Sequence, residues 1–329
     1  MPVLDVRDLK AYYITDRYGR ISRVRAVDEV SFQVHKNEIY GIAGESGCGK
    51  SSLLKVVSGL SKPPLRILDG EVIYKFDDNE LNMLSLKDDK QRRQLRGTHI
   101  SSIPQASMNV LNPVRRIEKS FQDFVSVHFE INNKAQFNEM VREHLSALGL
   151  DWDIMHAYPH QLSGGMRQRV IIALATILKP DIIFADEPTT ALDVVVQRGV
   201  VQLIKKINEE QHNTIIMVTH DMAIHANLCD RLAIMYAGKI VEEADAHTIF
   251  HDAKHPYTTM LLKSLPKIGD ESERESAPGA PPSLVDVPPG CRFHPRCPKA
   301  TELCCKEEPQ LIEIEKGHRV ACFHEGGSR

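Results

Sequence analysis

Long hydrophobic runs are missing from this sequence. The longest nearly unbroken one covers residues 170–178, whereas a transmembrane helix needs about 20 apolar residues. Charged residues also stand near the amino terminus, where a signal peptide would carry its apolar stretch. We therefore expect a chain that neither spans a membrane nor is exported, with the cytoplasm as its compartment.

An excess of charge of one sign is missing as well. Lys and Arg number 41 against 44 Asp and Glu, which gives a formal net charge of −3. This balance argues against a dedicated nucleic-acid-binding protein, which normally carries a basic surface. The hydrophobic fraction of 42% and the charged fraction of 26% are typical of globular proteins. At 329 residues, we expect a large α/β domain with an appendage, or two domains.

Cysteine is scarce until the end of the chain. The sequence has seven cysteines, and only Cys48 and Cys229 precede residue 290. The others follow it: Cys291, Cys297, Cys304, Cys305 and Cys322. In a reducing cytosol this clustering indicates a metal site before it indicates disulfide bonds.

Short runs rich in Ile and Val alternate with helix-length segments over most of the first 250 residues. The clearest predicted strands are residues 39–43, 182–185, 215–218 and 232–236. Each is followed by a loop or helix signal, which is the pattern of βαβ units around a parallel sheet buried on both faces. The sequence therefore predicts an α/β fold.

Two segments interrupt this alternation. Between about residues 106 and 175 the pattern is helical, notably at 114–128 and 135–148, which predicts a helical insertion. Residues 269–290 are rich in Pro, Ser and acidic residues, a composition typical of a linker. We therefore expect three parts, namely a main domain at 1–265, a linker at 266–290 and a Cys-rich extension at 291–329.

A phosphate-binding loop follows the first predicted strand. Residues 44–51 fit the pattern G-x-x-x-x-G-K-[S/T] and precede a helical run. Glycines let backbone N–H groups turn toward phosphate oxygens, Lys50 adds a positive charge, and the Ser51 hydroxyl can ligate Mg²⁺. The residues predicted to bind nucleotide here are Gly44, Glu45, Ser46, Gly47, Cys48, Gly49, Lys50, Ser51 and Ser52.

An acidic pair follows the strand at 182–185. Asp186 would bind Mg²⁺ through water, and Glu187 would accept the proton of the water that attacks the γ-phosphate. The plainer alternative is that the pair ends a strand and faces solvent. Beside a phosphate-binding loop, the catalytic interpretation is favoured.

Between these motifs stands the string LSGGMRQ at residues 162–168, and with it about the first 265 residues resemble an ABC transporter ATPase. The resemblance implies a P-loop core with a RecA-like sheet, an antiparallel β subdomain and a helical subdomain insertion. It also implies four roles: Gln105 as the catalytic Q-loop glutamine that contacts Mg²⁺ and the membrane subunit, Asp193 in the D-loop, His220 as the switch histidine at the γ-phosphate, and Tyr13 as the aromatic ring on adenine.

Three of these residues have plainer alternatives. Taken alone, a histidine such as His220 more often packs than reacts. Tyr13 stands beside Tyr12, and tyrosines are common at strand edges; Gln105 could be an ordinary surface residue in a loop. The match to the family motifs favours the functional interpretation in each case.

The signature string suits a phosphate contact. Ser163, Gly164 and Gly165 open a predicted helix, so free N–H groups and a hydroxyl stand at its positive end. In the family this segment, together with Gln168, closes on the phosphate-binding loop of another subunit. Since the chain carries one set of motifs, the resemblance implies a second cassette, either a copy or a homologue.

The last third of the chain resembles the ATPase subunits of oligopeptide and dipeptide importers, on residues 255–258, 261–266 and 290–298. That resemblance implies a [4Fe–4S] cluster on Cys291, Cys297, Cys304 and Cys322, with Cys305 left over. The spacing lacks the C-x2-C knuckle typical of structural zinc, but a mixed Cys/His zinc site and an extension without metal stay open. The histidines available for zinc are His294, His318 and His324. A metal would act as a staple for an extension too small to bury a core.

We therefore predict the ATP-hydrolysing subunit of an ABC importer for di- and oligopeptides, peripheral to the cytoplasmic face of the membrane. The implied partners are a second ATPase, two permease subunits and an extracytoplasmic solute-binding protein, without nucleic acid. Residues 105–113 depart from the usual peptide-importer string and also suit relatives that import oligosaccharides. A soluble ABC ATPase of DNA repair or translation is the alternative from another class, and a regulatory module without turnover is disfavoured by Glu187.

Overall fold

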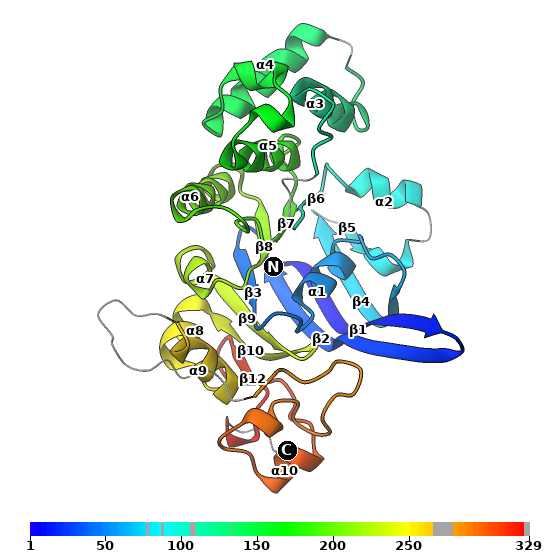
Figure 1. The fold of residues 1–329 in the computed structure, drawn as a ribbon, viewed down its shortest axis with the longest axis vertical. Coiled ribbons are helices and arrows are strands. Elements are labelled where there is room, and N and C mark those ends of the chain that lie inside the picture. Colours follow the sequence, from blue (N-terminus) through cyan, green and yellow to red (C-terminus); the bar gives the residue numbers. More distant parts are fainter. Residues whose placement is uncertain (77–78, 87–88, 106–109, 132, 266–278, 326–329) are drawn as a thin grey trace.

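The chain forms two β-sheets with helices around them (Figure 1). The computed structural model describes residues 1–76, 79–86, 89–105, 110–131, 133–265 and 279–325. Most of the predicted linker, at 266–278, and part of the segment that bears on peptide or oligosaccharide cargo, at 106–109, lie outside these ranges. Among the described residues, no helix is both long and apolar enough to span a bilayer.

The larger sheet has eight strands in the order β11-β12-β10-β9-β3-β8-β7-β6. Five neighbouring strands are parallel, and their bounds are Ile39–Ala43 (β3), Ile100–Ile103 (β6), Ile182–Asp186 (β7), Thr214–Val218 (β8) and Arg231–Tyr236 (β9). The other three are antiparallel, and their bounds are Lys239–Asp245 (β10), Ile312–Glu315 (β11) and His318–Val320 (β12). The four strands predicted from sequence are all present, in a mixed sheet.

Every residue of β3, β7 and β8 is buried, because apolar cores cover both faces of the sheet. Successive residues of β7 divide between them: Ile183 packs in the core under the helical insertion, and Phe184 packs in the core toward the second sheet. This double burial explains why these strands are mostly apolar instead of alternating with polar residues, with Thr214 at the start of β8 and Asp186 at the end of β7 as the polar exceptions.

The second sheet is antiparallel, with strand order β2-β1-β4-β5. Its strands are Pro2–Arg17 (β1), Arg20–His35 (β2), Leu65–Phe76 (β4) and Asn79–Asn82 (β5). The first two form a long hairpin that extends sideways from the molecule in Figure 1. Helix α1 (Lys50–Val57) packs Leu53 and Val56 into the core that both sheets share.

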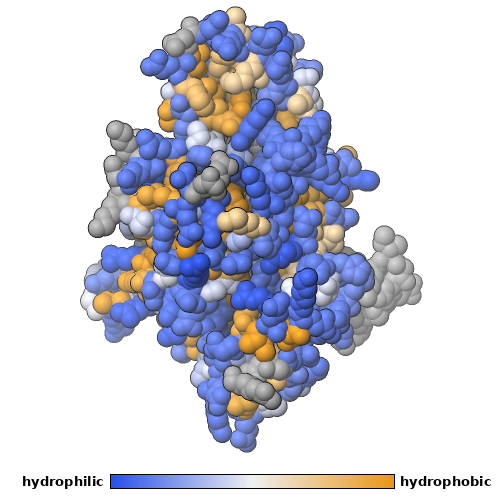
Figure 2. All heavy atoms as spheres, turned by 180° about the vertical axis from the view of Figure 1, so that it is seen from behind, coloured by the Kyte–Doolittle hydropathy of each residue, from blue (hydrophilic) through white to orange (hydrophobic). Residues whose placement is uncertain are grey.

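The predicted insertion is helical, and it forms the upper end of the molecule in Figure 1. It contains α3 (Ile117–Ser126), α4 (Lys134–Ala147) and α5 (Gly164–Thr176). The first of these turns Ile117, Phe121 and Val125 inward at helical spacing. Figure 2 shows an apolar patch at this end, and further apolar patches over the middle and lower parts of a mostly hydrophilic surface.

The remaining α-helices of the described residues lie between strands of the sheets or in the last third of the chain. They are α2 (Asp89–Leu95), α6 (Val194–Gln211), α7 (Met222–Leu228), α8 (Ala246–Asp252), α9 (Pro256–Lys263) and α10 (Glu302–Lys306). The Cys-rich end is joined to the main sheet by backbone pairing, because β12 lies antiparallel to β10, with Glu242 opposite Val320.

Candidate functional site

The phosphate-binding loop turns between β3 and α1 in a conformation that requires glycine. Gly44 has φ 147°, and a Cβ there would lie 2.1 Å from the carbonyl oxygen of Met235. Gly49 has φ 112°, and its Cβ would lie 2.0 Å from the carbonyl oxygen of Ala26. Since backbone atoms cannot swing aside, any side chain at either position would force the loop to move.

Lys50 lies inside this loop. Its ammonium group donates to the carbonyl oxygens of Gly44 at 2.8 Å and Glu45 at 2.9 Å. The residue is only 6% exposed, so the charge is held at a fixed place in the cleft. A phosphate there would meet a cation that is already oriented.

A cleft of about 680 Å³ opens beside the loop. Many of the residues predicted from sequence line it, along with Val24, Ala26 and Leu284, which had no sequence signal; Leu284 lies within the predicted linker. The hydroxyls of Tyr13 and Ser52 lie 3.0 Å apart at its wall. Tyr12 is directed elsewhere, because its hydroxyl donates to Asp28, so the structure distinguishes the two neighbouring tyrosines.

Ser51 and Asp186 face each other across the loop and the end of β7. The Ser51 hydroxyl donates to Asp186 Oδ1 at 2.8 Å. Burial raises the pKa of Asp186, and the Ser51 hydrogen bond and the nearby Lys55 and Lys50 oppose that shift. A hydroxyl and a carboxylate are oxygen ligands suited to Mg²⁺.

Glu187 follows β7 and meets residues that follow two neighbouring strands. Its Oε1 lies 3.2 Å from His220 Nδ1, after β8, and its Oε2 lies 3.5 Å from Gln105 Nε2, after β6. Because the carboxyl ends of parallel strands share one edge of a sheet, residues far apart in sequence converge there. The structure thus places Gln105, Glu187 and His220 together beside the phosphate-binding loop.

The Glu187 carboxylate also accepts a 2.7 Å hydrogen bond from the Thr190 hydroxyl. Burial raises the pKa of Glu187, but the hydrogen bonds from Thr190 and His220 outweigh it and leave the pKa below its usual range. The group is therefore ionised at neutral pH, as a general base must be. Our sequence prediction missed Thr190, although its place three residues after Glu187 is a turn spacing that could have indicated the contact.

The signature segment lies away from this cleft. Ser163 caps α5, and its Oγ accepts the Met166 N–H at 3.2 Å. A Cβ on Gly165 would lie 2.7 Å from Val196 Cγ1, and the Val196 N–H is bound by Asp193, the cap of α6. Among the described residues that line the cleft, none belongs to the signature segment.

The cysteines of the extension gather around one narrow cavity. Cys291, Cys297, Cys304 and Cys322 all line it, whereas Cys305 is exposed outside it. Burial raises the pKa of Cys291 to about 11 and raises those of Cys297 and Cys322. In the described part of the chain, no three His, Cys, Asp or Glu side chains have the arrangement of a metal site.

The tail histidines differ in their surroundings. His294 and His324 line the cysteine cavity. The His318 ring instead lies 2.8 Å from the carboxylate of Glu242 in β10. Of the three histidines considered for zinc, His294 and His324 therefore stand beside the cysteines, and His318 does not.

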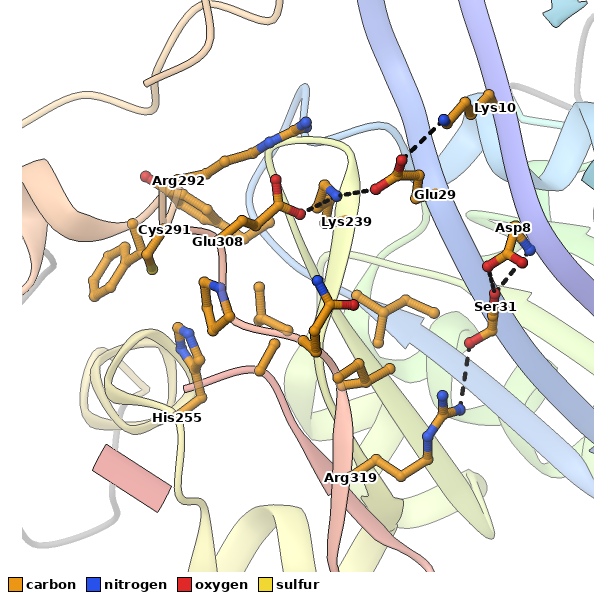
Figure 3. A pocket seen from close by; sticks show the side chains of 18 residues that line it. Asp8, Lys10, Glu29, Ser31, Lys239, His255, Cys291, Arg292, Glu308 and Arg319 are labelled. Carbon is orange, nitrogen blue, oxygen red and sulfur yellow. Dashed lines mark hydrogen bonds and ion pairs between the residues drawn. The ribbon is translucent and has the colours of Figure 1, made fainter. Parts of the chain in front are cut away.

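A further cavity, of about 610 Å³, separates the extension from the antiparallel sheet. Figure 3 shows four of its charged side chains, Lys10, Glu29, Lys239 and Glu308, joined in a row by ion pairs. Glu29 accepts from Lys10 at 2.9 Å and from Lys239 at 3.1 Å, and Lys239 also contacts Glu308. These ion pairs connect the antiparallel sheet to β10 and β10 to the extension.

Two family models match the chain. The ABC transporter model covers residues 27–190, and the model of the oligopeptide/dipeptide transporter C-terminal region covers residues 241–304. The first match includes the phosphate-binding loop, the signature segment and the acidic pair. The second includes Cys291, Cys297 and Cys304 of the cysteine cavity.

Several curated proteins are similar over nearly the whole chain. A dipeptide transport ATP-binding protein of Caldanaerobacter subterraneus subsp. tengcongensis is 38% identical over 98% of both chains. The dipeptide transport ATP-binding protein of Escherichia coli K12 is 38% identical over 91% of both, and its oligopeptide counterpart is 37% identical over 98% of this chain and 93% of that one.

A solved structure shares the cassette fold. It is a dimeric ATP-binding cassette in a post-hydrolysis state bound to ADP and Pi, with a TM-score of 0.62 and 27% identity over 74% of this chain and 98% of that chain. The 37–38% identity to the curated proteins over at least 91% of this chain, together with the two matched family models, establishes the relationship. The chain belongs to the ABC transporter ATP-binding proteins of the oligopeptide/dipeptide family.

Proposed function

We propose that this chain hydrolyses ATP to drive the uptake of di- and oligopeptides through partner permease subunits. The observation that carries the proposal is the convergence of Gln105, Glu187 and His220 on the cleft beside Lys50. A hydrolase of nucleotide triphosphates needs a phosphate-binding loop and an ionised, oriented carboxylate that can act as general base. The cargo is inferred from the oligopeptide/dipeptide family.

In the proposed reaction, Glu187 removes a proton from water as the water oxygen attacks the γ-phosphorus in line. The bond between that phosphorus and the oxygen bridging to the β-phosphate breaks, so the products are ADP and phosphate. His220 and Gln105 orient the Glu187 carboxylate, and Lys50 and the loop N–H groups stabilise the phosphate charge. Tyr13 would stack on adenine.

Mg²⁺ fits the site because oxygen donors meet there. Ser51, Gln105 and Asp186 would hold it, since the Ser51 and Asp186 oxygens already lie within 2.8 Å of each other. When bound, Mg²⁺ neutralises charge on the phosphate oxygens. Proton removal, orientation of the carboxylate and binding of the phosphates are carried out by the chain's own residues.

A second cassette would complete the site. Ser163, Gly164, Gly165 and Gln168 would contact the ATP of that partner, with Asp193 at the interface. In support, Val194 and Val195 directly after Asp193 are 80% and 82% exposed. Apolar side chains so open to solvent in a monomer suit a contact between subunits.

The helical end would contact the permeases at the cytoplasmic face of the membrane, with an extracytoplasmic protein delivering the peptide. Val110 and Val114 follow the Q-loop and are 56% and 80% exposed. They belong to the insertion, whose end of the molecule carries the apolar surface visible in Figure 2. Motion near Gln105 would thereby reach the permease.

The extension would hold a [4Fe–4S] cluster on Cys291, Cys297, Cys304 and Cys322. Four thiols around one cavity are the donor set that such clusters use. Zinc is the second candidate, because His294 and His324 line the same cavity. The bound group would serve as a structural staple.

The test is reconstitution of the chain with its two permeases, its second ATPase and its solute-binding protein in lipid vesicles. We expect ATP-dependent accumulation of a radiolabelled dipeptide or tetrapeptide inside the vesicles. Uptake of an oligosaccharide instead would assign the alternative cargo, that of relatives which import oligosaccharides. Failure to purify with any permease, together with ATPase activity in the soluble fraction, would overturn the transport assignment.

A further inference from the structure

The Cys-rich extension contacts the phosphate-binding loop through an ion pair. Arg296, the residue before Cys297, donates Nη1 to Glu45 Oε2 at 2.7 Å and Nη2 to Glu45 Oε1 at 3.0 Å. Two parallel bonds between a guanidinium and a carboxylate fix orientation as well as distance. Glu45 is the second residue of the loop, so a side chain 251 positions away is bound to it.

Glu45 is held by its backbone too. Its N–H donates to the Tyr257 hydroxyl at 2.8 Å, and its carbonyl oxygen accepts from Lys50 Nζ at 2.9 Å. The Arg296 bonds therefore restrain a residue whose own carbonyl orients the phosphate-binding lysine. Glu45 is absent from the cleft lining among the described residues, so it acts from behind the loop.

Arg296 is itself fixed before any nucleotide arrives. Its side chain is 6% exposed, and it belongs to the short 3-10 turn His294–Arg296. Phe293, just before this turn, packs its ring 5.2 Å from that of Tyr236 and 5.4 Å from that of Tyr257. The guanidinium thus projects from a rigid aromatic cluster and not from a free surface loop.

From this geometry we infer that Arg296 and Glu45 are positioning residues for nucleotide binding, through which the Cys-rich extension sets the affinity of the phosphate-binding loop. Releasing the ion pair would let the loop sample conformations that do not bind phosphate. The apparent affinity is the intrinsic affinity multiplied by the fraction of molecules in the competent conformation, so it falls as that fraction falls. Loss of the Arg296 guanidinium would also leave the Glu45 carboxylate uncompensated close to an anionic ligand.

The chemistry should change little once nucleotide is bound. Glu187, Gln105 and His220 contact neither member of the pair in the described structure. The predicted signature is therefore a raised KM for ATP at a nearly constant kcat. A residue with a purely structural role would instead reduce the amount of active protein, which lowers kcat and leaves KM unchanged.

The test compares Arg296→Gln, Glu45→Gln and the double variant in the full chain. We expect each single variant to weaken binding of Mg-ADP by about tenfold, the range for a hydrogen bond to a charged group. The double variant should bind no more weakly than the weaker single variant, because both changes remove one interaction. Isothermal titration gives the dissociation constants, and steady-state assays of the transporter give KM and kcat.

Two further variants separate positioning from folding. Arg296→Lys keeps the charge and should recover part of the affinity. Arg319→Gln is the matched control, because Arg319 also joins the extension to the cassette, at 2.9 Å from Glu243, yet it stands apart from the loop. Unchanged Mg-ADP affinity in both Arg296→Gln and Glu45→Gln, or an equal loss in Arg319→Gln, would overturn the inference.

Discussion

Glu187 combines an unusual backbone with a well-held carboxylate. Its φ of 47° lies in the left-handed region, which costs free energy for a residue with a side chain. The conformation is fixed by its N–H, which donates to the Val218 carbonyl oxygen at 2.8 Å, and by the contacts of its carboxylate. Strain tolerated at this point in the chain fits a residue whose direction matters for chemistry.

Replacing Glu187 with Gln tests its role as the base. The amide keeps the shape of the side chain but cannot take a proton, so hydrolysis should fall at least about 100-fold. Binding of Mg-ATP should persist, because the phosphate-binding loop is untouched. Phosphate release and nucleotide titration measure the two properties.

The control for that variant is Glu209→Gln, which changes an exposed glutamate on α6. It should retain normal turnover. If Glu187→Gln also hydrolysed ATP at the normal rate, another group would have to be the base.

Thr190→Val tests the hydrogen bond that lowers the pKa of Glu187. Valine has the shape of threonine without the hydroxyl, so the carboxylate loses a donor and its pKa should rise. A base with a higher pKa is protonated at a higher pH, so the acid limb of the kcat profile should move to higher pH. Thr190→Ser keeps the hydroxyl and should keep the wild-type profile; an unshifted limb in Thr190→Val would contradict the prediction.

Residue types explain which parts of the site the sequence could predict. Gly44, Lys50 and Asp186 stand in short motifs whose chemistry is local, and strand order brings Gln105 and His220 to the same sheet edge. Leu284 could not be predicted, because it lies within the predicted linker and reaches the cleft only through tertiary packing. Its carbonyl oxygen accepts the Arg25 N–H at 2.8 Å.

Among elements, the buried parallel strands were the easiest to predict. β3, β7 and β8 are buried at every position and mostly apolar, because both their faces are covered. The β1–β2 hairpin gave no comparable pattern, and only the family resemblance implied an antiparallel subdomain. Its register shifts repeatedly, for example between Val6 and Leu9, and each shift interrupts the alternation that a strand prediction needs.

Helix α5 depends on its cap. Ser163→Ala removes the hydroxyl that accepts the Met166 N–H, which should lower the free energy of unfolding by about 1 kcal/mol. Urea denaturation monitored by circular dichroism measures this difference. Ser126→Ala is the control, since that hydroxyl bonds within α3 to the Asp123 carbonyl and caps no helix start; equal losses in both variants would argue against a specific capping role.

At the scale of the whole molecule, the extension is an integral part of the cassette. Arg292 contacts Asp28 and the Ala237 carbonyl, and His318 bonds to buried Glu242. These contacts join parts of the chain separated by the linker, so no local pattern could indicate them. Composition and the family resemblance predicted a separate Cys-rich part, and the arrangement of its contacts came only from the structure.

Neighbouring cysteines offer a matched test of the proposed cluster. Cys304 lines the cavity and Cys305 is exposed. Cys304→Ser should lose the brown colour and most of the iron of anaerobically purified protein, whereas Cys305→Ser should keep about four irons per chain. Iron analysis and visible absorption measure both, and colourless wild-type protein with one zinc per chain would replace the cluster with zinc.

The last hairpin of the extension also closes an open edge. β12 covers β10, and β11 then becomes the outermost strand, with Glu313 and Glu315 turned to solvent. Charged side chains on an outermost strand discourage pairing with other chains. A protein cut before this hairpin would present the bare hydrogen-bonding groups of β10 to its neighbours, so we expect it to self-associate through that edge.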